Sequence, residues 1–256
     1  MKWQWWKFVL LGAVFYLLFV VAVAPAAWLA WGVARASGGM VTLSEPVGSV
    51  WSGAGGLVIH NGTAAPQPLG QLEWTINPAW LFAARLQTRV RLTGLDSDLS
   101  GSVDVSYKRA RLQHIKGSIS PRLLIVVYAP VSLFDPSGQF QVTSESLQIA
   151  ASGIDGVLQL TWQDAGLNLS DVRPLGDYKL QVEGAGNMLR LKIETLKGAL
   201  TINGQGEANL DNKQLQFAGT AMPQTRATEL EPVLRMLGND IGGGKRSFAL
   251  NGRIPI

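Results

Sequence analysis

The sequence predicts a mainly β fold: an N-terminal transmembrane helix, a curved antiparallel β-sheet domain built as one unit or as two related halves, and a short C-terminal helix. Two observations support this prediction. Residues 8–34 contain no charged side chain. The rest of the chain alternates apolar and polar residues between Gly, Asn, Asp and Pro, which is typical of half-buried strands. We therefore expect an anchor over residues 1–37 and a β-rich domain over 38–256, with 40–120 and 121–256 as the two halves.

The uncharged segment is long enough to cross a bilayer, because about 20 apolar residues suffice at about 1.5 Å per residue. Pro25 lies inside it, so the regular helix should kink or end there, with the spanning part over residues 5–24 and an interfacial turn after it. The residues expected to form the membrane anchor are Phe8, Leu11, Phe15, Leu18, Val21, Trp28 and Trp31.

The charges flanking this segment predict its orientation. Lys2 and Lys7 precede it and only Arg35 follows closely, so the positive-inside rule places the N-terminus in the cytoplasm. The protein is then a single-pass protein of the bacterial inner membrane with its bulk in the periplasm. A cleaved signal peptide is the alternative, since residues 22–24 resemble a cleavage site, but Pro25 would follow the cut and the apolar run continues past it.

Composition excludes several classes of function. The net charge is +4 and its Lys and Arg are scattered, so no basic stripe indicates nucleic-acid binding. The chain has no cysteine, which excludes disulfides, thiolate metal sites and cysteine nucleophiles.

Alternation predicts specific strands, each with one apolar and one solvated face. The clearest lie at residues 57–59, 72–76, 86–92, 103–105, 189–193 and 215–217. A short helix or turn should follow Asn77-Pro78. A helix is expected over Thr228–Leu237, with Thr228 and Glu231 as a capping box and Gly238 after its end. Periodicity leaves the apolar run 123–128 open, although its β-branched residues favour a buried strand.

A weak internal sequence repeat bears on whether the β-rich domain consists of two related halves. Pro68-Leu69-Gly70 and Pro174-Leu175-Gly176 each open an alternating strand. Two such turns are also expected by chance in a turn-rich chain, so the sequence leaves the duplication open.

No catalytic, metal-binding or cofactor-binding residue can be named. His60 and His114 lie in predicted strands or at their edges without an acidic cluster nearby, which favours surface histidines over ligands. Motifs of metalloproteases, serine hydrolases and P-loop nucleotide-binding proteins do not occur. We therefore expect no enzyme activity, no cofactor and no nucleotide partner.

Four tryptophans could fill a core or line a groove: Trp51, Trp74, Trp80 and Trp162. The core interpretation is favoured. If the sheet curls without closing, its apolar concave face could instead hold a lipid chain or a partner segment.

The order and spacing of several motifs resemble the type II secretion system protein N family nearly end to end. These motifs are the anchor, the segment 48–53, the strand from Leu72 to Trp74 leading to Pro78, the Pro-Leu-Gly turn at 174–176, the segment 200–204 and the terminal Leu-rich helix. Residues with a structural role by this resemblance are Gly48, Trp51, Gly53, Pro78, Pro174, Gly176 and Gly204. The resemblance implies a single-pass inner-membrane protein that takes part in secretion without catalysis. The expected fold is also similar to AsmA-type periplasmic proteins.

Two functions follow as expectations. The first is a non-catalytic inner-membrane component of the type II secretion system, which acts in export of folded proteins across the outer membrane through contacts with other components. The alternative is a periplasmic lipid-binding or lipid-transfer module that uses the apolar sheet face. The expected partners are other secretion components and inner-membrane lipid.

Overall fold

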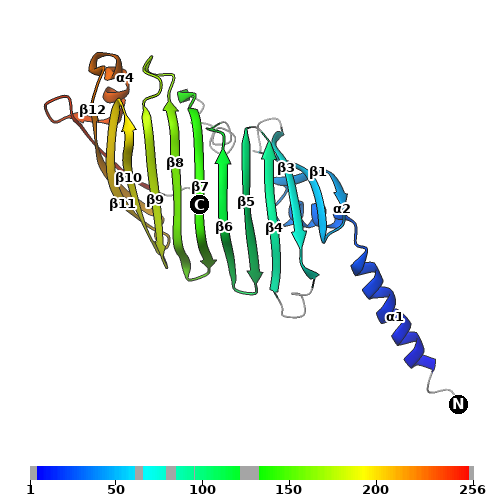
Figure 1. Ribbon diagram of the computed structural model, residues 1–256. Helices are drawn as coiled ribbons and strands as arrows, with labels where there is room; N and C mark the ends of the chain where they lie inside the picture. Colours follow the sequence, from blue (N-terminus) through cyan, green and yellow to red (C-terminus); the bar gives the residue numbers. More distant parts are fainter. Residues whose placement is uncertain (1–4, 61–65, 79–84, 95, 122–132, 254–256) are drawn as a thin grey trace.

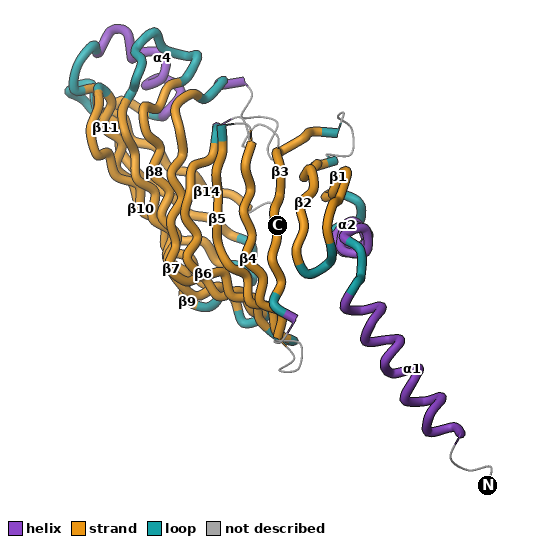
Figure 2. The backbone as a smooth tube through the Cα atoms, turned by 45° about the vertical axis from the view of Figure 1, so that its right-hand side comes forward, coloured by secondary structure: helices purple, strands orange, loops and turns teal. Residues whose placement is uncertain are grey.

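The computed structural model describes residues 5–60, 66–78, 85–94, 96–121 and 133–253. Two helices, α1 (Trp5–Ala22) and α2 (Ala26–Ala36), precede one antiparallel sheet of 14 strands, and α4 (Ala227–Leu237) lies near its C-terminal end. The sheet is open and curved, and α1 projects from one end of the molecule (Figures 1 and 2). The predicted fold class is confirmed.

The strands follow one another along the chain. They are β1 (Val41–Gly48), β2 (Ser52–Ile59), β3 (Gln67–Ile76), β4 (Arg85–Gly94), β5 (Ser97–Ser106), β6 (Arg109–Ile119), β7 (Ser137–Ala150), β8 (Gly153–Gly166), β9 (Gly176–Ala185), β10 (Met188–Gly198), β11 (Leu200–Asn209), β12 (Gln214–Pro223), β13 (Asn239–Asp240) and β14 (Arg246–Arg253).

Each strand from β1 to β11 pairs with its successor, and β14 then lies between β12 and β13. Antiparallel neighbours can be joined by tight turns, as at residues 107–108 between β5 and β6 and at residues 151–152 between β7 and β8. Every strand predicted from alternation falls inside an observed strand, namely β2, β3, β4, β5, β10 and β12. The apolar run 123–128 and Trp80 lie outside the described residues.

The N-terminal helix breaks where Pro25 predicts. α1 ends at Ala22, and Pro25 is the N-cap of α2. The segment after the break is a second helix rather than the expected turn, and it packs on the sheet through Ala26, which is 1% exposed, and through Leu29, Ala30 and Val33. Gly38 and Gly39 form the turn between α2 and β1. A helix can start at Pro25 because proline there loses no hydrogen bond.

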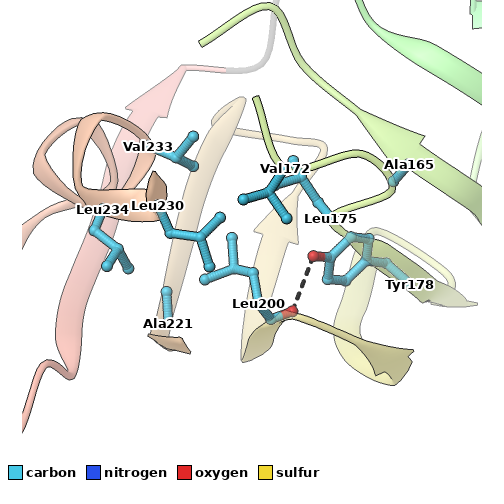
Figure 3. Packing of buried hydrophobic residues seen from close by; sticks show 9 residues of the cluster. All are labelled: Ala165, Val172, Leu175, Tyr178, Leu200, Ala221, Leu230, Val233 and Leu234. Atoms are coloured by element: carbon cyan, nitrogen blue, oxygen red, sulfur yellow. Dashed lines mark hydrogen bonds between the residues drawn. The ribbon is translucent and has the colours of Figure 1, made fainter. Parts of the chain in front are cut away.

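Two separate cores hold the sheet. The first joins α2 to the early strands through Ala26, Leu43, Trp74 and Ile76. The second joins α4 to the late strands, with Leu230, Val233 and Leu234 packed over Leu200 and Ala221 (Figure 3). Each helix therefore covers the apolar side of the sheet at one end.

The prediction that Thr228 and Glu231 form a capping box at the start of the C-terminal helix is wrong. The helix begins at Ala227, its N-cap is Arg226 in a left-handed conformation at φ 53°, and no side chain caps it. Backbone N–H groups of Glu229 and Leu230 donate to the Arg226 carbonyl, so Thr228 already lies in the first turn. Glu231 binds Arg235 and Arg246 instead, at 3.0 and 3.1 Å, which ties α4 to β14.

The two Pro-Leu-Gly segments have similar surroundings. Gly70, in β3, lies directly against Gly94 of β4, and Gly176 lies directly against Gly198 of β10. A side chain on any of these glycines would meet the backbone opposite. Each segment therefore starts its strand with a close cross-strand glycine pair.

Candidate functional site: the anchored end and the two faces of the sheet

The turn between β1 and β2 attaches the membrane-type helix to the sheet. The indole N–H of Trp51 donates to the Val21 carbonyl at 2.9 Å, and the backbone N–H of Val50 donates to the Ala24 carbonyl at 2.9 Å. Pro25 and Ser49 form a β-bridge. The end of α1 is therefore fixed by three contacts within the sequence motif 48–53.

Trp74 supports this turn through its buried indole ring. Its indole N–H is shared between the carbonyls of Ser49 and Val50, each at 3.2 Å, and its side chain is 3% exposed. Gly53 allows the close approach, since a Cβ there would lie 2.6 Å from Cζ2 of Trp74. Gly48 has φ +92° at the start of the turn, where a side chain would be strained. The glycines and tryptophans of the motif thus form one joint.

Trp162 belongs to the other core. Its ring lies 5.3 Å from Phe140 and 6.1 Å from Tyr178, between ring centroids. Tyr178 donates its hydroxyl to the Leu200 carbonyl at 2.9 Å, and burial, with a smaller effect of Asp177, raises its phenol pKa well above the usual value. The structure places Trp74 and Trp162 in separate clusters rather than in one groove.

The remaining motif residues have local roles. Pro174 follows a cis peptide bond just before β9, and Gly176 makes the close pair described above. Gly204 lies beneath the Phe217 ring, whose atoms a Cβ would meet at 2.9 Å. Pro78 is the last described residue after β3.

The expected anchor side chains are exposed along the helices. Trp5–Ala22 is the helix, among those the structure describes, that is long and apolar enough to cross a membrane, and none of it is buried. Trp28 and Trp31 are 54% and 70% exposed on α2. The other anchor residues on α1 that can be placed are Phe8, Leu11, Phe15 and Val21, all exposed, whereas the Leu18 side chain lies outside the description.

No catalytic arrangement emerges around the histidines. His60 follows β2, and His114 lies at φ 51° on β6. Within the described ranges, no group of three or more His, Cys, Asp or Glu side chains could hold a metal ion.

The register gives the sheet one continuous apolar face, because directly paired residues share a face. Across β3, β4 and β5, Leu72 pairs with Leu92, which pairs with Leu99. Across β8, β9 and β10, Leu158 pairs with Val182, which pairs with Leu191. These central side chains are only half-buried, whereas the ends of the same face are covered by α2 and α4.

The opposite face is polar and holds a cluster that sequence reasoning missed. A cavity of about 380 Å³ is lined by Arg85, Asp104, Ser106, Tyr107, Lys108, Arg109 and Arg111. The available signal was the spacing of Arg109 and Arg111 by two, which places both on one face of a strand. Arg85 lies beside them because β5 pairs with both β4 and β6. This strand order could not be predicted from the sequence.

Comparison with known proteins gives one match. The model of the type II secretion system protein N family matches residues 39–249. No curated protein and no solved structure matches the chain, so the expected likeness to AsmA-type proteins stays a prediction. The match covers the sheet from β1 to the first half of β14, the β1–β2 joint and α4, and on this basis the chain belongs to the type II secretion system protein N family.

Proposed function

We propose that this secretion component is a non-catalytic protein of the inner membrane, crossing it once through α1. The N-terminus would lie in the cytoplasm and the sheet in the periplasm, where it would contact other components during export of folded proteins across the outer membrane. The joint between α1 and the sheet is the observation that carries this proposal. Three contacts fix the sheet directly at the end of the exposed apolar helix, as a membrane-proximal scaffold requires.

The outer edge of β14 is the best place for a protein contact. β13 pairs only with Arg246 and Ser247, so residues 249–253 have no outer strand partner in the described part of the chain. All five residues are exposed, and Leu250 is 57% exposed. An open strand edge can add a strand from another protein through backbone hydrogen bonds.

The other edge of the sheet is protected. In β1, Glu45 has φ 48° and is followed by Pro46, and the pairing with β2 shifts between Ser44 and Val47. A charge, a proline and a bulge on an edge strand each oppose strand addition. The two edges therefore provide a test and its matched control.

A photo-crosslinking amino acid at Asn251, in secreting cells that make the full chain, tests this contact. We expect an adduct with another secretion component, identified by mass spectrometry, and no such adduct from the same amino acid at Glu45. Adducts from Glu45 alone, or from neither position, would exclude the β14 edge as the contact.

Orientation can be tested separately, because the chain has no cysteine. Leu196→Cys, at a residue of β10 that is 54% exposed, should react in intact spheroplasts with a maleimide that cannot cross membranes. Lys7→Cys should react only after the membrane is opened. The reverse pattern would contradict the proposed topology.

A lipid-handling role is the second candidate, supported by the half-buried apolar face between α2 and α4. Lipid extraction and native mass spectrometry of the purified protein would support it if one phospholipid per chain remained, and if Leu158→Asp, on that face, removed the lipid. An empty folded protein would leave protein contacts as the better account.

A further inference from the structure

Four cations meet at one end of the polar face. Arg85 begins β4 and pairs with Ser106 at the end of β5, and Ser106 in turn pairs with Arg109 of β6. Arg111 lies two residues further along β6, and Lys108 is in the β5–β6 turn. The register therefore places the three arginines on one face, around a cavity of about 380 Å³. This volume is within the range of about 300–1,000 Å³ found for small-molecule sites.

The positive charge of this cluster is largely uncompensated. Among the described residues that line the cavity, Asp104 is the one carboxylate beside the four cations, which leaves a formal excess of three positive charges. Among the residues that the structure describes, no carboxylate lies within 4.0 Å of a charged nitrogen of Arg85, Lys108, Arg109 or Arg111. Arg111 donates to the oxygen of the neutral Gln148 amide at 3.0 Å. The cluster is thus available to an anion.

The cluster lies at the end of the sheet from which α1 leaves. Trp51, which binds the end of α1, also accepts a hydrogen bond from the Ile76 backbone N–H at 2.6 Å. Ile76 pairs with Thr88, and Arg85 lies three residues further toward the same end, about 10 Å at strand spacing. Figure 1 shows α1 and the β5–β6 turn both directed toward the lower end of the molecule.

Tyr107 adds a second feature of a membrane-facing rim. It is 95% exposed at the tip of the β5–β6 turn, directly beside Lys108. Tyrosine is favoured at the headgroup level of a bilayer, because its ring is apolar and its hydroxyl is polar. Basic side chains near a membrane surface are attracted to anionic lipids.

We propose that this cavity binds the phosphate of an anionic phospholipid headgroup in the membrane that holds α1. Arginine suits this ligand, because its planar guanidinium can bind two phosphate oxygens at once. Arg85 and Arg109 would contact the phosphate from adjacent strands, Lys108 would approach it as a point charge, and Tyr107 would enter the headgroup layer. This inference rests on the proposed membrane anchoring of α1 and adds a lipid class and a site to it.

The test uses the full chain in nanodiscs that contain equal parts of phosphatidylglycerol and phosphatidylcholine. Native mass spectrometry then measures which lipid stays bound when the protein is released. The wild-type chain should retain phosphatidylglycerol preferentially. Arg85→Gln combined with Arg109→Gln should lower that preference about 25-fold, since each basic residue near the surface contributes roughly fivefold.

The matched control is Lys179→Gln combined with Arg190→Gln, which removes two charges from the same face on β9 and β10. This control should keep the wild-type preference. Lys108→Gln is a second, milder variant, because a turn side chain is removed without touching a strand pair, and it should lower the preference about fivefold. Circular dichroism establishes that each variant is folded.

Several results would overturn the proposal. These are equal retention of both lipids by the wild-type chain, an unchanged preference in the Arg85 and Arg109 variant, and an equal loss in the control. Binding of inorganic phosphate to the cavity without enrichment of phosphatidylglycerol would also overturn the proposal, because the cavity would then bind free phosphate rather than a lipid headgroup. Extraction of the wild-type chain from membranes by alkaline carbonate would instead contradict the anchoring itself, so the two failures can be told apart.

Discussion

Trp51 donates its indole N–H to the carbonyl of Val21 across 2.9 Å, and this bond joins the β1–β2 turn to the last turn of α1. The free carbonyls at a helix end need partners, and here the sheet supplies one. The direction of α1 relative to the sheet is therefore set by the fold rather than by a flexible linker.

Trp74→Phe tests the support beneath this turn. Phenylalanine keeps most of the buried apolar surface but leaves the carbonyls of Ser49 and Val50 without the indole donor. We expect the free energy of unfolding to fall by about 1–3 kcal/mol, measured by chemical denaturation. Trp31→Phe, on the exposed side of α2, should cost less than about 0.5 kcal/mol, and an equal loss in both variants would contradict the joint.

Gly198→Ala tests the close glycine pair of the second Pro-Leu-Gly segment. Gly198 has φ +142°, and a Cβ there would collide with the Gly176 backbone, so we expect a loss of roughly 2–4 kcal/mol. Gly252→Ala is the control, because nothing lies within 4 Å of its Cβ position. Thermal unfolding should separate the two variants, and similar midpoints would show that the pair tolerates a side chain.

Gly94→Ala extends this test to the proposed related halves. Gly94 has φ +135° and its Cβ would lie 2.7 Å from the Gly70 Cα. If the two pairs play the same structural part, its cost should match that of Gly198→Ala within about 1 kcal/mol. A neutral Gly94→Ala would remove this support for related halves.

Leu230→Ala tests the attachment of α4. Leu230 is 0% exposed and packs in the second core, so truncation should cost about 2–5 kcal/mol through lost burial and a cavity. Limited proteolysis should then cut near α4 before the wild-type chain is cut. Met236→Ala is the matched control, since Met236 is 50% exposed on the same helix, and earlier cleavage of this control would contradict the packing.

Much of the sheet could be predicted because each strand has one apolar face, and a period of two is visible in the sequence. Residues 72–76 and 189–193 show this pattern most clearly, and they lie in β3 and β10. The break at Pro25 was likewise predictable, since proline lacks the N–H that a helix needs.

Other features depended on contacts between distant residues. The apolar side chains of α2 look the same in sequence whether they face lipid or the sheet, so its packing on β1 was missed. α4 starts after Arg226, whose backbone is in the left-handed conformation. Glu231 forms an ion pair with Arg246 of β14 instead of capping the helix. The basic cavity arises only when the register aligns Arg85, Ser106 and Arg109.

The most direct test of the central claim is exoprotein secretion in cells that lack this protein, measured together with outer-membrane permeability. We predict that secretion of folded exoproteins falls while permeability stays normal, and that the full chain restores secretion. Normal secretion combined with a permeability defect would contradict a role in secretion and favour lipid handling.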